Sequence, residues 1–138
     1  MITIKNLDHV VLRVRDAAAM VAFYRDVLGC PVERELDIGL IQLRAGNSLI
    51  DLVPVDSELG RRGGRSPGAL DNNMDHFCLR VEPFSADLIE QHLSRNGVEV
   101  DDVSRRYGAD GFGPSIYVRD PEGNTVELKG PPDADQTA

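Results

Sequence analysis

Two short stretches that combine apolar and polar residues dominate the pattern of the chain. Residues 7–14 read Leu-Asp-His-Val-Val-Leu-Arg-Val, and residues 74–81 read Met-Asp-His-Phe-Cys-Leu-Arg-Val, with five of eight residues identical. Runs rich in Val and Leu predict β-strands, in which alternate side chains share a face. Each predicted strand therefore carries its histidine and its arginine on one face and an apolar row on the other.

The elements that follow each of these strands also repeat. Apolar residues at helical spacing over 16–29 and again over 85–97 predict an amphipathic helix in each half. Asp16 and Ser85 are the expected N-caps, and Gly29 and Gly97 mark the C-terminal ends. In the first half, strands are predicted at 31–36, 40–43 and 48–53. In the second half, they are predicted at 98–100, 115–119 and 125–129, with a glycine-rich loop over 103–114.

This order predicts an α+β fold of two βαβββ modules within one domain of residues 1–138. The modules span residues 5–55 and 74–130. Residues 56–73 are rich in glycine and arginine and are interpreted as a linker, which is long enough to pair the modules within a chain or across two chains. Residues 131–138 are polar and are predicted to be disordered.

Composition and charge narrow the range of partners. The chain of 138 residues has a formal net charge of −8, which argues against binding to nucleic acid or to an anionic membrane surface. No apolar run is long enough to span a membrane, and the N-terminus lacks the pattern of a signal peptide, so we expect a cytoplasmic protein. Cys30 and Cys78 have no metal-like spacing and are interpreted as two buried, reduced thiols.

The final strands of the two halves supply the candidate chemistry. Gly46-Asn47-Ser48 precedes Asp51 in the first half, and Gly123-Asn124-Thr125 precedes Glu127 in the second. Each half therefore provides one histidine on its first strand and one carboxylate on its last. We expect four side chains to bind one divalent metal: His9, Asp51, His76 and Glu127. This mixed nitrogen and oxygen set suits Ni, Co, Mn, Fe or Zn.

Over residues 5–129 the chain resembles the vicinal oxygen chelate superfamily, which includes glyoxalase I, extradiol dioxygenases, fosfomycin-resistance thiol transferases and bleomycin-resistance proteins. The resemblance is carried by five motifs: Leu-Asp-His at 7–9, Phe-Tyr at 23–24 with Val-Leu-Gly at 27–29, Met-Asp-His at 74–76, Asp-Pro-Glu-Gly-Asn at 120–124, and Glu127-Leu128. It implies curled mixed sheets that form a metal-binding cavity, with ligands at the four positions named above. Asp51 departs from the glutamate found at this place in glyoxalase I enzymes.

The resemblance implies an enzyme, and we favour a metal-dependent lyase or isomerase of glyoxalase I type. Its substrate would be a small α-oxygenated carbonyl compound or its thiol adduct, for which a glutathione adduct is one candidate. Four ligands leave two coordination positions for neighbouring oxygens, and the metal would stabilise an enediolate formed by loss of a C–H proton. Glu127 is the preferred catalytic base as well as a ligand, and Asp51 is the second candidate.

Three further residues are candidates for substrate binding. Arg13 corresponds to the arginine that holds a glutathione carboxylate in glyoxalase I, a task suited to a bidentate guanidinium. Tyr107 and Phe112 lie in the glycine-rich loop and are expected to line the pocket. The loop lacks the Lys-Gly-Gly-like stretch of glyoxalase I enzymes.

Other members of the superfamily leave alternatives open. An Fe(II) extradiol dioxygenase needs only His9, His76 and Glu127. A fosfomycin-type thiol transferase also fits three ligands. A non-catalytic drug-binding protein of the bleomycin-resistance kind has no need of four matched ligands. The resemblance also implies a homodimer.

Overall fold

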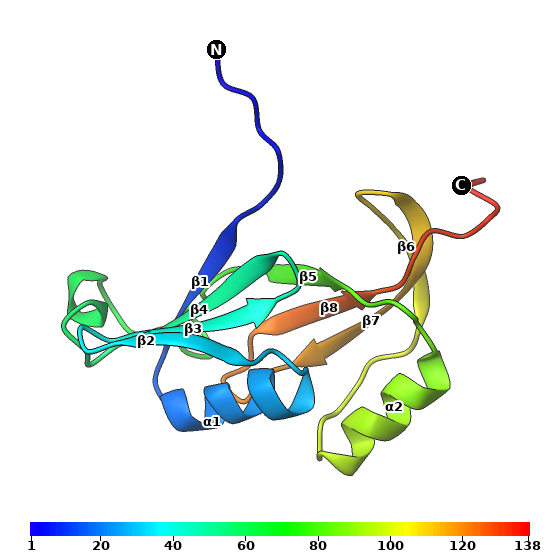
Figure 1. The fold of residues 1–138 in the computed structure, drawn as a ribbon. Coiled ribbons are helices and arrows are strands. Elements are labelled where there is room, and N and C mark those ends of the chain that lie inside the picture. The colour runs from blue at the N-terminus through cyan, green and yellow to red at the C-terminus, as the bar shows by residue number, and fades with distance from the viewer. The chain divides into compact units, whose positions relative to one another are not determined.

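The computed structural model describes all 138 residues and divides them into two compact units, Met1–Asn73 and Met74–Ala138. The division falls immediately before the second copy of the repeated strand. Each unit contains one four-stranded mixed sheet and one principal helix, so the α+β class and the βαβββ order are confirmed (Figure 1).

The first unit has the predicted βαβββ order. Its elements are β1 (His9–Val14), α1 (Ala17–Ala22), η1 (Phe23–Val27), β2 (Val32–Leu36), β3 (Leu40–Ala45), β4 (Ser48–Pro54) and η2 (Gly60–Arg62). The strand order in the sheet is β1-β4-β3-β2, with β1 parallel to β4 and the other neighbours antiparallel. After β1 and α1, the chain returns to the same sheet, to which β2, β3 and β4 all belong.

Local chemistry explains the helix of this unit. The side chain of Asp16 accepts a hydrogen bond from the backbone N–H of Ala19 at 3.0 Å, as expected for an N-cap. The helix widens into the π-helical turn η1, in which the N–H of Leu28 donates to the carbonyl of Phe23 at 3.1 Å. Gly29 then takes a φ of +76°, a conformation that favours glycine.

One face of the first sheet and one side of α1–η1 form an apolar core. The fully buried side chains of this core are Leu12, Val14, Met20, Tyr24, Leu43, Ile50 and Leu52. Burial of each such side chain stabilises the fold by about 1.5–3 kcal/mol. Because side chains alternate along a strand, this core leaves His9, Val11 and Arg13 on the other face of β1.

The second unit repeats the arrangement. Its elements are β5 (His76–Arg80), α2 (Ala86–Arg95), β6 (Ser104–Gly108), β7 (Gly111–Arg119) and β8 (Thr125–Lys129), and its strand order is β5-β8-β7-β6. Ser85 caps α2 by accepting from the N–H of Leu88 at 3.4 Å. Its buried apolar side chains are Leu93, Ile116, Val118, Val126 and Leu128.

The Asp120–Asn124 turn between β7 and β8 is held by one carboxylate. Oδ1 of Asp120 accepts from the backbone N–H groups of Glu122 and Asn124, at 3.0 and 2.9 Å, and Oδ2 accepts from the Asn124 side chain at 2.7 Å. Asp120 is 4% exposed, so these bonds satisfy a buried carboxylate. This turn fixes the register of β8, the strand that carries Glu127.

The prediction for residues 98–114 was wrong in part. The expected strand at 98–100 is only an isolated bridge between Val100 and Val118, and the expected glycine-rich loop is the hairpin of β6 and β7. Glycine is a poor strand former, but two of these glycines provide room for a neighbour. A Cβ at Gly108 would lie 2.5 Å from Cε of Lys129, and one at Gly113 would lie 3.1 Å from its Nζ.

Two segments without predicted structure make defined contacts. In residues 56–73, η2 forms a short 3-10 turn, and the side chain of Asn73 bonds the backbone N–H and carbonyl of Arg13 at 3.1 and 3.0 Å. Residues 131–138 have no regular secondary structure, and the N–H of Asp133 donates to the carbonyl of Phe112 at 2.7 Å. No helix is long and apolar enough to cross a membrane.

Candidate metal-binding residues

Each unit places one histidine and one carboxylate on the sheet face opposite its apolar core. In the first unit Val11 pairs with Asp51 across the parallel strands β1 and β4, and His9 lies two residues before Val11. In the second unit Cys78 pairs with Glu127 across β5 and β8, and His76 lies two residues before Cys78. We call His9–Asp51 and His76–Glu127 the two donor pairs.

In the first unit both members of the donor pair are oriented by neighbours. Nδ1 of His9 lies 2.7 Å from Oδ1 of Asp8. Asp51 is only 3% exposed, and both of its oxygens accept from Nε2 of Gln42 at 3.2 Å. The hydrogen bond to Asp8 raises the pKa of His9; burial opposes this shift, and the charges of Asp51 and Asp8 add smaller upward contributions.

In the second unit the donor pair is in direct contact. Nε2 of His76 lies 3.8 Å from Oε1 of Glu127, and Nδ1 of His76 is hydrogen-bonded to Asp75. Glu127 is 6% exposed. An ionised carboxylate can only accept hydrogen bonds, so a neutral histidine bonded to it through Nδ1 presents the lone pair of Nε2. Asp8 and Asp75 therefore select the same tautomer of the two histidines.

Tyr117 connects both members of the second donor pair. Its ring makes an edge contact with the His76 ring at a centroid separation of 5.4 Å, and its hydroxyl lies close enough to Glu127 for that carboxylate to raise its pKa. The guanidinium of Arg106 lies over the face of the Tyr117 ring, 4.2 Å from its centroid. Burial first, and then the hydrogen bond and charge of Glu127, raise the pKa of Tyr117, which keeps its hydroxyl protonated as a donor.

Cys78 also contacts Glu127, and the expectation that both cysteines are buried was wrong for this residue. Cys30 is buried and Cys78 is exposed, and both are free thiols. The exposed residue nevertheless turns its Sγ toward Oε2 of Glu127, at 3.2 Å. Desolvation of the sulfur first, and then its hydrogen bond to Glu127, raise the pKa of Cys78 to about 12. The thiol is thus a neutral donor to the carboxylate.

The chemistry of the two donor pairs fits a divalent cation. Both carboxylates are buried, and neither has a lysine or arginine partner; their contacts are the neutral donors described above and His76. A buried carboxylate without a cation is costly, so a bound metal ion would compensate it. No group of three or more His, Cys, Asp or Glu side chains is positioned to hold a metal ion, so each unit brings together two of the four expected ligands.

Arg13 faces the same side of the first sheet as its donor pair. Its guanidinium donates to the carbonyls of Arg65, Gly64 and Gly60 at 2.9, 2.9 and 3.2 Å, while its buried Nε has no hydrogen-bond partner. Arg80 is its counterpart in the repeat but pairs instead with Glu82 and Asp110, at 3.0 and 2.7 Å. The arginine at this position of the repeat thus binds backbone carbonyls in the first unit and forms ion pairs in the second.

Tyr107 and Phe112 lie together near the end of the β6–β7 hairpin. Their rings meet edge to face at 5.0 Å, and Arg105 stacks on Phe112 at 4.3 Å. In the strand register they are paired with each other, while Tyr117 is paired with Glu127. Because Phe112 and Tyr117 are five residues apart on one strand, Phe112 and Tyr107 face the opposite side of this sheet from Glu127.

Several residues that contact the donor pairs were not assigned a role from the sequence: Asp8, Gln42, Asp75, Cys78 and Tyr117. Gln42 and Tyr117 occupy the same place in the two sheets, because each is the antiparallel partner of the candidate carboxylate. The repeated Asp-His dipeptide was a visible signal for Asp8 and Asp75. The signal for Gln42 and Tyr117 required the register of the β3–β4 and β7–β8 hairpins, which the predicted strand positions did not specify.

Comparison with known proteins agrees with the fold. The model of the Glyoxalase/Bleomycin resistance protein/Dioxygenase superfamily matches residues 6–128, and the chain belongs to this superfamily. The chain is also 30% identical, over 126 residues, to the virulence protein STM3117 of Salmonella typhimurium, a match that covers 91% of this chain and 83% of that protein.

Solved structures show the same architecture. The crystal structure of STM3117 superposes with a TM-score of 0.77 at 26% identity, covering 94% of this chain and 99% of that chain. The lactoylglutathione lyase of Agrobacterium tumefaciens superposes with a TM-score of 0.68 at 23% identity, covering 93% and 95%, and at this identity it supports the fold alone.

Proposed function

We propose that the protein is a metal-dependent lyase or isomerase of glyoxalase type, and that His9, Asp51, His76 and Glu127 are its metal ligands. The substrate would be a small molecule with an oxygen next to a carbonyl group, or its thiol adduct. The observation that supports this most is the duplicated donor pair, which combines a histidine of fixed tautomer with a buried carboxylate in each unit. Family membership supports the same reading.

A divalent ion bound by these ligands would polarise the substrate carbonyl and stabilise the negative charge that develops when a neighbouring C–H proton is lost. Asp8 and Asp75 would hold the imidazoles with Nε2 available. Gln42 would orient the carboxylate of Asp51 through its amide.

In this proposal Glu127 also accepts the substrate proton and returns it to the adjacent carbon. One of its oxygens, Oε1, faces His76, while Oε2 accepts from the Cys78 thiol, so the two oxygens have different environments. The Tyr117 hydroxyl, whose pKa Glu127 raises, is a further neutral group beside this carboxylate. Neutral donors orient a carboxylate without removing its ability to take up a proton, which a bidentate arginine would oppose. Asp51 is the second candidate for this role.

Metal stoichiometry provides the direct test. Titration of metal-free protein with Ni²⁺ in a calorimeter should give one ion per chain, and His9→Ala, His76→Ala and Glu127→Gln should each weaken binding by about 10-fold or more. His92→Ala removes an exposed histidine on α2 and serves as the matched control. Two ions per chain, with each unit binding independently, would contradict a shared four-ligand site.

Reaction type is tested with the loaded protein. Conversion of the hemithioacetal of methylglyoxal and glutathione, followed by absorbance, would identify glyoxalase I activity. Consumption of O₂ with catechol and Fe(II) would instead support the dioxygenase. Glu127→Gln should abolish turnover more completely than Asp51→Asn if Glu127 is the base.

A further inference from the structure

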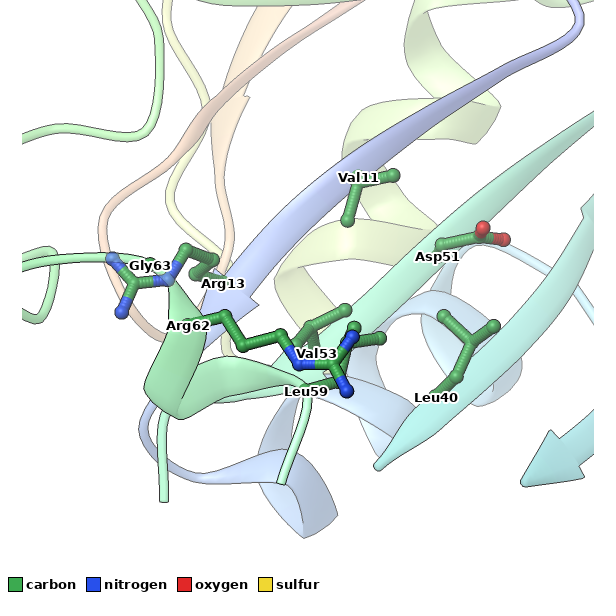
Figure 2. Close-up of a pocket in the computed structure, with 8 residues that line it drawn as sticks. All are labelled: Val11, Arg13, Leu40, Asp51, Val53, Leu59, Arg62 and Gly63. Atoms are coloured by element: carbon green, nitrogen blue, oxygen red, sulfur yellow. The ribbon is translucent and has the colours of Figure 1, made fainter. Parts of the chain in front are cut away.

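A cavity in the first unit extends from the candidate ligand Asp51 toward the segment 60–65. Its volume is about 470 Å³, within the usual range for small-molecule sites. The residues that line it are Val11, Arg13, Leu40, Asp51, Val53, Leu59, Arg62 and Gly63. Figure 2 shows Asp51 on one side, Arg13 and Gly63 on the other, and the Arg62 side chain extending into the space between them.

The walls of this cavity are largely apolar. Val11 and Val53 lie between Asp51 and Arg13, Leu40 lies beside Asp51, and Leu59 lies near η2 (Figure 2). A ligand in this cavity would therefore meet a carboxylate or its metal at one end, the Arg13 guanidinium at the other, and apolar side chains together with the Arg62 guanidinium between them. An apolar body with few fixed polar groups is the usual composition of a specific ligand site.

Arg13 holds the segment that carries Arg62. Its guanidinium donates to three main-chain carbonyls in residues 60–65, and no carboxylate neutralises its charge. A Cβ at Gly63 would lie 2.7 Å from Nε of Arg13, so the absence of a side chain there allows the chain to close over the guanidinium. The positive charge of Arg13 is thus fixed at this end of the cavity, with Nε still unsatisfied.

Arg62 is the cation free to meet a ligand. Its only carboxylate partner is Glu58 at 3.7 Å, and the two side chains are 70% and 67% exposed. Such an exposed pair is worth only about 0–1 kcal/mol. Arg65, in contrast, is paired with Asp71 at 2.9 Å. In a chain of net charge −8, the sequence Gly-Arg-Arg-Gly-Gly-Arg at 60–65 concentrates three cations without an acidic residue.

We propose that Arg62 recognises an anionic group of the substrate, and that Arg13 is a positioning residue that fixes the 60–65 segment for this purpose. The substrate class is a small molecule with a carboxylate or phosphonate group, separated by a short apolar segment from the oxygens that approach Asp51. Arginine suits this task because its planar fork binds such groups through two hydrogen bonds. The identity of the substrate oxygens that approach Asp51 rests on the proposed function, whereas recognition of the anionic group by Arg62 does not.

The test uses the full-length, metal-free protein, so it does not depend on whether the metal site exists. Amide chemical shifts are followed by NMR during titration with phenylphosphonate, with phenylacetate, and with the neutral analogue benzyl alcohol. Arg62→Gln is compared with Arg61→Gln, which removes an exposed neighbouring arginine that does not line the cavity. Arg62→Lys retains the charge without the fork.

The proposal predicts that at least one of the two anions shifts the resonances of Val11, Val53 and residues 59–63, with benzyl alcohol binding about 10-fold more weakly. Arg62→Gln should weaken binding of the anion by a similar factor, and Arg62→Lys should weaken it by less. Arg61→Gln should weaken it by under about 2-fold. Equal loss in Arg61→Gln and Arg62→Gln, or binding of benzyl alcohol as tight as that of both anions, would overturn the proposal. Calorimetric Ni²⁺ binding by the same variants reports separately on the proposed function.

Discussion

Nε2 of His76 lies 3.8 Å from Oε1 of Glu127, while Nδ1 of the same ring is hydrogen-bonded to Asp75. The ring is thus held on one side by an exposed carboxylate and faces a buried one on the other. His9 has the same arrangement with Asp8 on the adjacent residue. The repeated Asp-His dipeptide therefore has a physical reason, because it fixes which nitrogen of each imidazole is available to a ligand.

Replacement of the orienting aspartates should weaken metal binding without removing a ligand. In Asp75→Asn and Asp8→Asn the amide no longer requires a proton on Nδ1, so part of the population adopts the other tautomer. We expect a loss of about 10-fold in Ni²⁺ affinity for each variant. Calorimetry checks this, and Asp37→Asn, at an exposed turn residue, is the control. Unchanged affinity in both variants would mean that the two aspartates do not orient the histidines.

Replacement of Arg13 should release the 60–65 segment. Arg13→Gln removes three hydrogen bonds from a charged donor to backbone carbonyls, whereas Arg80→Gln changes the repeat counterpart and leaves this segment untouched. Limited trypsin digestion followed by mass spectrometry should show cleavage after Arg61, Arg62 or Arg65 accelerated at least about 10-fold in Arg13→Gln only. Equal rates in the two variants would show that Arg13 does not hold the segment.

Lys129 should limit the stability of the protein. Its side chain is 3% exposed, and Nζ has no hydrogen-bond partner. An ammonium buried in this way loses hydration without gaining a hydrogen bond, so Lys129→Met should raise the free energy of unfolding by about 1–3 kcal/mol. Urea denaturation measures the change, with Lys5→Met as the exposed control, since the chain has no other lysine. A destabilised Lys129→Met protein would indicate that the ammonium has a stabilising role.

Stability should fall at alkaline pH, and Cys30 should contribute to the fall. Burial raises the pKa of Cys30 above its ordinary value of 9.0, so the folded state retains the thiol proton more tightly than the unfolded chain. This contribution is fully present below pH 9.0 and is lost as the pH rises through the folded-state pKa. Cys78 and Tyr117 have raised pKa values and act in the same direction.

Unfolding free energies of the wild-type protein and Cys30→Ala, measured from neutral pH to above the ordinary thiol pKa, test this sign. The wild-type curve should decline more steeply than that of Cys30→Ala at the alkaline end, whereas the two curves should be parallel near neutrality. Parallel curves throughout the range would show that the Cys30 thiol does not ionise on unfolding.

The repeated strand, the helix caps and the final turn were predictable because their signals are local. His9 and His76 share a face with Arg13 and Arg80 through simple alternation, and Asp16 and Ser85 cap helices through contacts three residues away. The positions of Asp51 and Glu127 followed from the second occurrence of the hairpin. Comparison of the two repeats thus identified Asp51 and Glu127 as equivalent positions, which neither half would have indicated alone.

Other features depended on pairing between distant strands, which the amino-acid sequence leaves open. That Gln42 and Tyr117 both contact a candidate carboxylate is decided by hairpin register, and a shift of one residue would turn each side chain to the other face. The contact of Arg13 with Gly60, Gly64 and Arg65 depends on how a glycine-rich segment folds back on the sheet. Sequence alone determined which residues could bind a metal and on which strands they lie, because strand alternation is a local property. Only the tertiary structure decided which neutral donors surround those residues and that a guanidinium closes the cavity beside them, because these contacts join positions that only folding brings together.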